Sequence, residues 1–364
     1  MIGAIIGDMV GSIYEFDNIK TKAFKIFTDG MEPTDDSVLT VATADWLLHG
    51  GEVGDYYWRY ALAYPDPKGS YGPGFWSWVQ RSKHGLAKPY GSCGNGSAMR
   101  VSPVGWFFET EEETLDAAKR SAECTHDHPE GIKGAQATAL AIFLARHGAT
   151  AEAIKERIER DYGYDLSLSI DEIRPRYSWN GMDNVGNGGT CQGSVPQAIA
   201  CALQATDFED AVRNAVSIGG DSDTIGCIAG AIAEALFGVP QWMQDVAMER
   251  MAERLSVQLC DMVMAFTFHL SNIGKSSQIE RIVAMENRLN RALQAVDELE
   301  HAQKHFEEVK EDIKVLEQYL GSDEWKADFA ADEAGQLPSD LRRGVLSEDG
   351  IWNLLERVKL MNNE

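Results

Sequence analysis

Apolar residues recur at spacings of three and four positions through most of the first 270 residues. This spacing gathers apolar side chains on one face of a helix, and it therefore predicts helices. The predicted helices cover residues 37–48, 114–124, 132–146, 151–160, 195–203, 208–216, 225–237 and 241–270. The alternating pattern of a half-buried strand is scarce, and residues 166–170 are its best short candidate. We therefore expect an all-α domain whose connections are irregular and rich in glycine.

Small residues recur every four positions in two of the apolar runs. They are Gly3, Gly7 and Gly11 in one run, and Gly226 and Gly230 in the other. In membranes this spacing allows helices to dimerise closely. In a compact core it allows two helix backbones to approach each other, and this is the use that we expect here.

The last 90 residues have a different composition, rich in Glu, Lys, Gln and Leu. The Gly/Ser-rich segment 271–277 marks the change, so we expect a core domain over residues 1–270 and a helical or coiled-coil extension over 277–364. Two apolar stripes in the extension are out of register by one residue, which fits either a stutter in one helix or a helical hairpin. The stripes consist of Ile282, Leu289, Leu293 and Val296, and of Phe306, Val309, Ile313, Leu316 and Leu320. A last helix is predicted over residues 348–361. We expect this extension to pack or associate rather than to carry chemistry.

Composition and charge limit the class of protein. With 364 residues and 44% hydrophobic residues, the chain can bury a large core. The net charge of −24 argues against nucleic acid or an anionic membrane as the main partner, because binding phosphate requires basic patches. The six cysteines form no CxxC pair, and the longest apolar run, 225–237, is too short to span a bilayer. We therefore expect reduced thiols in a cytoplasmic protein.

The first candidate chemical feature is the sequence Thr34-Asp35-Asp36, which precedes a predicted helix. Such residues commonly cap a helix N-terminus, where a hydroxyl or carboxylate oxygen accepts a backbone hydrogen bond. One cap needs one acceptor, however, and two adjacent carboxylates repel each other unless a cation is present. Capping and metal binding are therefore both open readings of this cluster.

A second acidic cluster, Asp221-Ser222-Asp223-Thr224, follows two glycines and precedes the apolar helix predicted over 225–237. Glycines permit a tight turn, and alternate aspartates in a loop can aim both carboxylates at one point. Ligands that are all oxygen favour hard cations such as Mg²⁺, Mn²⁺ or Ca²⁺ over zinc. Taken together, the two clusters predict one divalent-metal site.

The N-terminal run places Asp8 and Glu15 seven residues apart, on one face if the helix continues that far. Alternatively Glu15 lies in a loop where the helix ends. A carboxylate close to metal ions is a candidate general acid or base, or a group that orients water.

Three glycine-rich loops are candidates for binding a ligand. Residues 91–100 expose backbone N–H groups that can cradle a phosphate, although ordinary turns have a similar composition. In residues 125–131, His126 is better suited to contact a sugar or base than to bind zinc, and an ordinary helix-start loop is an equal alternative. Residues 188–196 contain Cys191, and we do not expect it to be a nucleophile because no activating base is nearby.

Six segments of the chain, in this order, resemble the ADP-ribosylglycohydrolase family, which includes the dinitrogenase reductase-activating glycohydrolases. The resemblance covers about residues 1–270. The segments are GAIIGDMVGSIYEF, PTDDSVLT, GNGSAMRVSPVGW, THDHPEGIKGAQATALAIFLA, QGSVPQAIACAL and AVSIGGDSDTIGCIAGAIAEALFG. The resemblance implies an all-α fold around two adjacent Mg²⁺ or Mn²⁺ ions, with ADP-ribose bound over them.

The resemblance also assigns roles to particular residues. The implied metal ligands are Thr34, Asp35, Asp36, Asp221, Asp223 and Thr224. The implied catalytic residues are Glu15, Asp36 and Asp221. The implied ADP-ribose-binding residues are Asn95, Ser97, Met99, His126, Gly189, Thr190 and Ser194.

The expected reaction is hydrolysis of the glycosidic bond between ADP-ribose and a modified target, with protein arginine as the first choice. One alternative is an enzyme that acts on a small ADP-ribose derivative or another N-glycoside. Another is a non-catalytic protein that binds ADP-ribose or a toxin, as an immunity protein does. The extension lies outside the family resemblance, and it could form a homo-oligomer or bind a partner protein.

Overall fold

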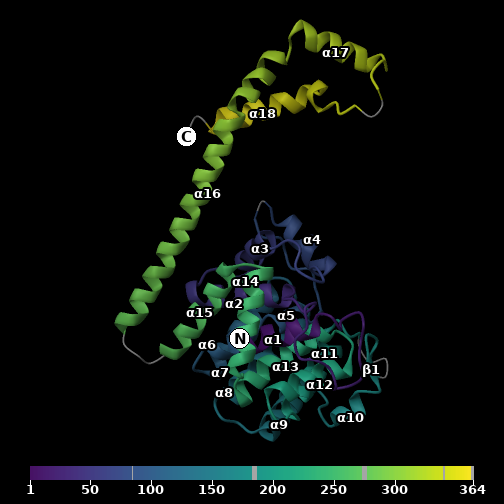
Figure 1. Ribbon diagram of the computed structural model, residues 1–364, viewed down its shortest axis with the longest axis vertical. Coiled ribbons are helices and arrows are strands. Elements are labelled where there is room, and N and C mark those ends of the chain that lie inside the picture. Colours follow the sequence, from purple (N-terminus) through teal and green to yellow (C-terminus); the bar gives the residue numbers. More distant parts are fainter. Residues whose placement is uncertain (84, 183–186, 273–276, 339–340, 362–364) are drawn as a thin grey trace. The chain divides into compact units, whose positions relative to one another are not determined.

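The computed structural model describes residues 1–83, 85–182, 187–272, 277–338 and 341–361 (Figure 1). The chain forms two compact units, Met1–Glu280 and Arg281–Glu364. Both units are built mainly from helices, so the expectation of an all-α domain is confirmed to the extent that the protein is mostly helical. The one sheet in the described residues is a two-stranded antiparallel pair, β1 (Tyr177–Ser178) and β2 (Gly181–Met182).

The first unit carries helices α1 to α15. Their bounds are α1 (Ile2–Gly11), α2 (Asp35–His49), α3 (Val53–Ala63), α4 (Pro73–Arg81), α5 (Gly96–Met99), α6 (Ser102–Phe107), α7 (Glu111–Glu123), α8 (Pro129–Arg146), α9 (Ala151–Tyr162), α10 (Ile170–Ile173), α11 (Cys191–Leu203), α12 (Phe208–Ile218), α13 (Ser222–Phe237), α14 (Gln241–Arg254) and α15 (Val257–Asn272). None of the helices in the described part of the chain is long and apolar enough to cross a membrane.

Two predictions about secondary structure were wrong. The helix predicted over 241–270 is two helices, α14 and α15, because the backbone leaves the helical region at Leu255 (φ −117°, ψ −82°). The Ser256 hydroxyl then accepts a hydrogen bond of 3.3 Å from Leu259 N, as a capping serine does at a new helix. Residues 166–170 form no strand; Ile170 instead begins α10.

Helices α1 and α13 cross with their backbones almost in contact, and they lie together at the centre of the first unit (Figure 1). A Cβ atom added at Gly7 would lie 1.9 Å from Gly226 O, and one at Gly3 would lie 2.4 Å from Gly230 O. The four-residue spacing of glycines therefore serves close packing in the core, as expected. This crossing brings Asp8 of α1 close to the acidic N-terminus of α13.

Most of α16 (Ser277–Tyr319) belongs to the second unit, which also contains α17 (Asp323–Glu333), the 3₁₀ helix η1 (Gly344–Leu346) and α18 (Glu348–Met361). Helix α16 is continuous, so the hairpin alternative is wrong. Trp325 anchors this unit: it is buried, and its Nε1 donates a hydrogen bond of 3.0 Å to Val345 O. Residues 273–276 of the expected hinge lie outside the described residues, and the domain boundary and the coiled-coil association stay predictions.

Candidate active site

Asp8 organises the N-terminus of α2 from the neighbouring helix α1. Its side chain is completely buried, and it accepts hydrogen bonds from Thr34 N (3.0 Å), Thr34 Oγ1 (2.7 Å), Ser37 N (3.1 Å) and the Ser37 hydroxyl. Burial raises the pKa of Asp8 to about 6, although these hydrogen bonds act to lower it. No local sequence pattern indicates this role of Asp8, because its partners lie more than 25 residues away in the chain.

The cluster Thr34-Asp35-Asp36 does cap a helix. Thr34 is the N-cap of α2, and its side chain accepts a hydrogen bond of 3.2 Å from Asp36 N. The two carboxylates are therefore not needed for capping. Asp36 is buried, and its Oδ2 has no hydrogen-bond partner among the described residues. Burial, and then the charge of Asp223, raise the pKa values of Asp35 and Asp36 well above their usual range.

The second cluster begins α13 directly after a sharp turn. Gly219 and Gly220 both have positive φ (72° and 73°), and a Cβ at Gly220 would lie 2.4 Å from the Tyr177 ring. Asp221 is the N-cap residue, and Asp223 lies in the first turn. Burial is the main cause that raises the pKa of Asp221 to about 6 and that of Asp223 well above its usual range.

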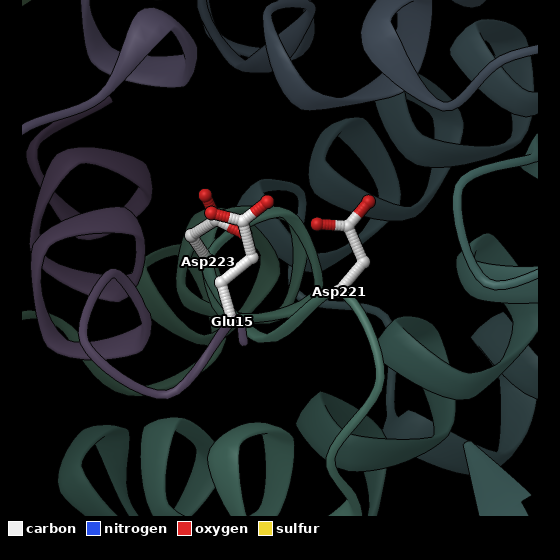
Figure 2. Close-up of side chains that lie close together, drawn as sticks. All are labelled: Glu15, Asp221 and Asp223. Atoms are coloured by element: carbon white, nitrogen blue, oxygen red, sulfur yellow. The ribbon is translucent and has the colours of Figure 1, made fainter. Parts of the chain in front are cut away.

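The structure brings the two clusters together. Thr224 Oγ1, in the first turn of α13, donates a hydrogen bond of 3.4 Å to Asp36 Oδ1 on α2. Glu15, Asp221 and Asp223 each offer a carboxylate oxygen, and these atoms lie within 4.8 Å of one another (Figure 2). Such a set of oxygen atoms suits a hard divalent cation.

Glu15 approaches this group from the loop after α1. Helix α1 ends at Gly11, so Asp8 and Glu15 do not share a helix face, and the loop alternative is correct. Burial raises the pKa of Glu15 to about 8, and the negative charges of Asp223 and Asp8 act in the same direction. A carboxyl group that keeps its proton near neutral pH can act as a general acid or base.

The loop of residues 65–70, which was not among the predicted site segments, also borders Glu15. Lys68 pairs with Thr34 in an isolated β-bridge, and its positive charge opposes the rise in the pKa of Glu15. A Cβ at Gly69 would lie 3.3 Å from Glu15 Oε2, and Ser70 has the unfavourable φ of 64°. The only signal in the sequence was the turn-forming run Pro-Asp-Pro-Lys-Gly at 65–69.

Trp179 was also missed, because it lies in a turn far away in the sequence. Its Nε1 donates a hydrogen bond of 2.8 Å to Glu15 O, which holds the loop that carries the carboxylate. Its ring stacks on Phe16, with 6.0 Å between centroids and 6° between planes. Phe16 is 79% exposed, so an aromatic surface lies next to Glu15.

Two of the glycine-rich loops pair along the edge of the acidic site. Asn95 N donates to Gly189 O (3.1 Å), and Gly94 and Thr190 form an antiparallel bridge. The Asn95 side chain donates a hydrogen bond of 2.7 Å to Asp221 Oδ2. These contacts place Asn95, Gly189 and Thr190 beside the carboxylates.

Three more of the predicted binding residues, Ser97, Met99 and Ser194, are buried. Ser97 and Ser194 are fully buried, and their hydroxyls donate to Gly131 O (2.7 Å) and Thr190 O (2.9 Å). Met99 is buried with its sulfur 4.0 Å from Thr224 Oγ1. Their role in binding a ligand stays a prediction. Cys191 is buried, which raises the pKa of its thiol to about 12 and makes it a poor nucleophile.

Comparison with known proteins decides the family. Residues 1–266 match the family model described as ADP-ribosylglycohydrolase. The chain belongs to the ADP-ribosylglycohydrolase family. It is thus an enzyme of the ADP-ribosyl hydrolase family, which implies an ADP-ribosylated substrate. Residues 282–363 match a separate model, a domain of unknown function (DUF4298).

Individual proteins are also similar to this chain in sequence or in fold. The chain is 28% identical over 317 residues to ADP-ribosylhydrolase ARH3 of Mus musculus, which covers 67% of this chain and 85% of the relative. It is 25% identical over 186 residues to ADP-ribosylarginine hydrolase Tri1 of Pseudomonas putida, covering 47% and 46%. A solved structure titled "ADP-ribosylglycohydrolase-related protein complex" has the same fold, with a TM-score of 0.50 and 24% identity over 72% of this chain and 96% of that chain.

Proposed function

We propose that this enzyme hydrolyses the glycosidic bond between ADP-ribose and a modified protein side chain, arginine in the first place, with two bound Mg²⁺ or Mn²⁺ ions. The proposal rests on the three neighbouring carboxylates of Glu15, Asp221 and Asp223, together with the membership of the chain in this family. The contact between Thr224 and Asp36 adds the α2 cluster to the same site.

The residues present fit divalent cations. Several buried carboxylates repel one another and hold raised pKa values, and Asp36 Oδ2 has no partner among the described residues. A dication would compensate both the repulsion and the lost solvation. The residues that would hold the ions are Thr34, Asp35, Asp36, Asp221, Asp223 and Thr224. When bound, such ions lower the pKa of a water and orient the ribose hydroxyls.

Glu15 would act as the general acid or base in the reaction. Cleavage breaks the bond from the ribose C1″ to nitrogen and forms a C1″–oxygen bond with water, so one proton leaves the water and one reaches the leaving group. In the metal-free site the pKa of Glu15 is raised to about 8, and bound dications would lower it, so that the carboxylate is available to take a proton from water at neutral pH. Asp36 and Asp221 would stabilise the oxocarbenium-like transition state by their negative charge.

The surface beside Glu15 supports arginine as the modified residue. The ring of Phe16 is mostly exposed, and it stacks on the ring of Trp179. A planar guanidinium stacks well on an aromatic face, whereas a serine hydroxyl gains nothing from it. The Pseudomonas putida relative is named as an ADP-ribosylarginine hydrolase. The ADP-ribose itself would be bound by Asn95, Ser97, Met99, His126, Gly189, Thr190 and Ser194.

A panel of linkages tests the substrate. ADP-ribose linked to an arginine peptide, to a serine peptide and to nucleic acid would be incubated with the enzyme and Mg²⁺ or Mn²⁺, together with free ADP-ribose derivatives. We expect the fastest release of ADP-ribose from the arginine peptide. Phe16→Ala should slow that release, whereas Phe16→Tyr keeps the aromatic face and should not. Fastest turnover of a free derivative would instead support the alternative of a small-molecule substrate.

The C-terminal extension would associate with a second copy or a partner protein. On α16, Leu289, Leu293 and Val296 are each more than half exposed, which is an unusual continuous apolar stripe for a monomer. We expect sedimentation to show a dimer or higher species that Leu289→Glu with Leu293→Glu dissociates. We also propose that the boundary between the catalytic domain and this extension lies at residues 270–277.

A further inference from the structure

Arg100 is a buried cation at the end of α5, outside the carboxylate group. It is 0% exposed, and its guanidinium carbon lies 3.9 Å from the centre of the Tyr57 ring. Its Nη2 donates hydrogen bonds of 2.8 Å to Ser121 O and to Thr125 Oγ1. Its Nε and Nη1 have no hydrogen-bond partner in the described parts of the chain. Burying an arginine in this way is costly, so its contacts require an explanation.

The hydrogen bond to Thr125 fixes the direction of a second one. Arginine can only donate, so Thr125 Oγ1 is the acceptor of that bond. The same hydroxyl lies 2.7 Å from His126 Nδ1 and is completely buried. The hydrogen of the Thr125 hydroxyl needs an acceptor, and the sulfur of the neighbouring Cys124 is only a weak acceptor. The hydroxyl therefore donates to Nδ1, and Nδ1 carries no proton.

The opposite arrangement is unfavourable. If Nδ1 carried the proton, the Thr125 oxygen would receive two donors, and its own buried hydrogen would be left with sulfur alone. A doubly protonated ring has the same defect. Burial and the positive charge of Arg100 also hold the pKa of His126 well below its usual range, so the ring is neutral. A neutral ring without a proton on Nδ1 carries it on Nε2.

The Nε2 atom faces the glycine-rich loop of the proposed ADP-ribose site. A Cβ atom added at Gly96 would lie 3.1 Å from His126 Nε2, and one added at Gly94 would lie 3.5 Å from it. Between these glycines lies Asn95, whose side chain contacts Asp221. The glycines therefore leave room for the Nε2–H group next to the carboxylate site.

We propose that Arg100 is a positioning residue that acts through the Thr125 hydroxyl to hold His126 as the Nε2–H tautomer, which donates a hydrogen bond to an acceptor oxygen of bound ADP-ribose. The identity of the ligand rests on the proposed function. The tautomer does not, because it follows from contacts inside the protein.

Nitrogen NMR of the full chain, labelled on histidine, tests the tautomer without any substrate. The His126 signals are those that disappear in His126→Gln. We expect a protonated Nε2 and an unprotonated Nδ1 in the wild type and in Thr125→Ser, which keeps the hydroxyl. Thr125→Val has the same shape without the hydroxyl, and Arg100→Met lacks the cation; both should lose this preference. If Arg100→Met does not fold, the two Thr125 variants decide alone. A proton on Nδ1 in the wild type, or an unchanged Thr125→Val, would overturn the proposal.

Calorimetric binding of ADP-ribose in the presence of Mg²⁺ tests the consequence. Thr125→Val and His126→Ala should bind about tenfold more weakly, as expected for losing a hydrogen bond to a charged or strongly polar ligand. Thr125→Ser should stay close to wild type, because it keeps the hydroxyl that orients the ring. Equal affinity of all four proteins would overturn the donor role. A wild type that shows the tautomer but does not bind ADP-ribose would contradict the proposed function and leave the role of Arg100 intact.

Discussion

The amide of Asn95 donates a hydrogen bond of 2.7 Å to the carboxylate of Asp221, across 126 residues of sequence. Asp221 in turn belongs to the group of carboxylates with Glu15 and Asp223. The glycine-rich loop is therefore attached directly to the proposed metal site. A residue that orients a metal ligand affects both the affinity for the metal and the position of the substrate.

Removing this amide should weaken metal binding. We expect Asn95→Ala to lower the affinity for Mn²⁺ by about 10- to 100-fold, the usual effect of losing a group that orients a ligand. Titration calorimetry of the metal-free protein measures it. Gln241→Ala removes an exposed amide at the start of α14 and serves as the control. Equal Mn²⁺ affinities in both variants would show that Asn95 does not orient the site.

Asp8 should be essential for stability. In Asp8→Asn an NH₂ group would face donors from Thr34 or Ser37, and a buried acceptor would be lost. We expect the free energy of unfolding to fall by about 2–4 kcal/mol, the range for a disrupted buried polar network. Urea unfolding in EDTA measures it, with the exposed Asp17→Asn as control. An unchanged urea midpoint in Asp8→Asn would be inconsistent with the hydrogen bonds described.

The crossing of α1 and α13 should not tolerate a methyl group. Gly7→Ala would place Cβ 1.9 Å from Gly226 O, so the helices must separate. We expect a loss of about 3 kcal/mol or more, at the upper end for overpacking, and a disturbed metal site. Gly72→Ala is a matched control, because its Cβ would meet nothing within 4 Å. Thermal unfolding compares the two, and equal midpoints would contradict this geometry.

The metal-free protein should become less stable as the pH rises. Glu15 has a usual pKa of 4.5, which the fold raises to about 8. Between these values the folded state holds a proton that the unfolded state releases, so the free energy of unfolding falls with increasing pH. Below pH 4.5 both states are protonated and the penalty is absent. Asp221, raised from 3.8 to about 6, adds to the same trend.

Urea unfolding in EDTA at pH 5, 6.5 and 8 measures this trend. Glu15→Gln cannot ionise, so its stability should fall less over this interval than that of the wild type. Added Mn²⁺ should stabilise the wild type more at pH 8 than at pH 5, because the ion binds the deprotonated carboxylates. Parallel pH profiles of wild type and Glu15→Gln would argue against the raised pKa.

Much of the fold could be predicted from local patterns. The apolar periodicity of α13 and the four-residue spacing of Gly3, Gly7 and Gly11 involve residues that are close together in the sequence. Both features could therefore be predicted. The break between α14 and α15 was missed, because a Leu-Ser step does not interrupt the apolar period. It became visible only through the backbone of Leu255 and the cap that Ser256 provides.

The site was predictable where its chemistry lies in short motifs. Both aspartate clusters are contiguous, and excess carboxylate at a helix N-terminus is visible in the sequence. Asp8, Lys68 and Trp179 act through contacts between segments that are distant in the chain, and no local pattern distinguishes them from structural residues. The glycine-rich loops were recognised, but their mutual pairing through Asn95 and Gly189 required the structure.

The most direct measurement of the central claim is the release of ADP-ribose from an ADP-ribosyl-arginine peptide by the metal-loaded enzyme and by the double variant Asp35→Asn with Asp223→Asn. We predict release by the wild type that stops with EDTA and returns with Mg²⁺ or Mn²⁺, and a loss of at least about 100-fold in the double variant, since several groups that act as a unit are removed. Circular dichroism would confirm that the variant is folded. Undiminished release by the folded double variant, or release that EDTA does not affect, would contradict the account.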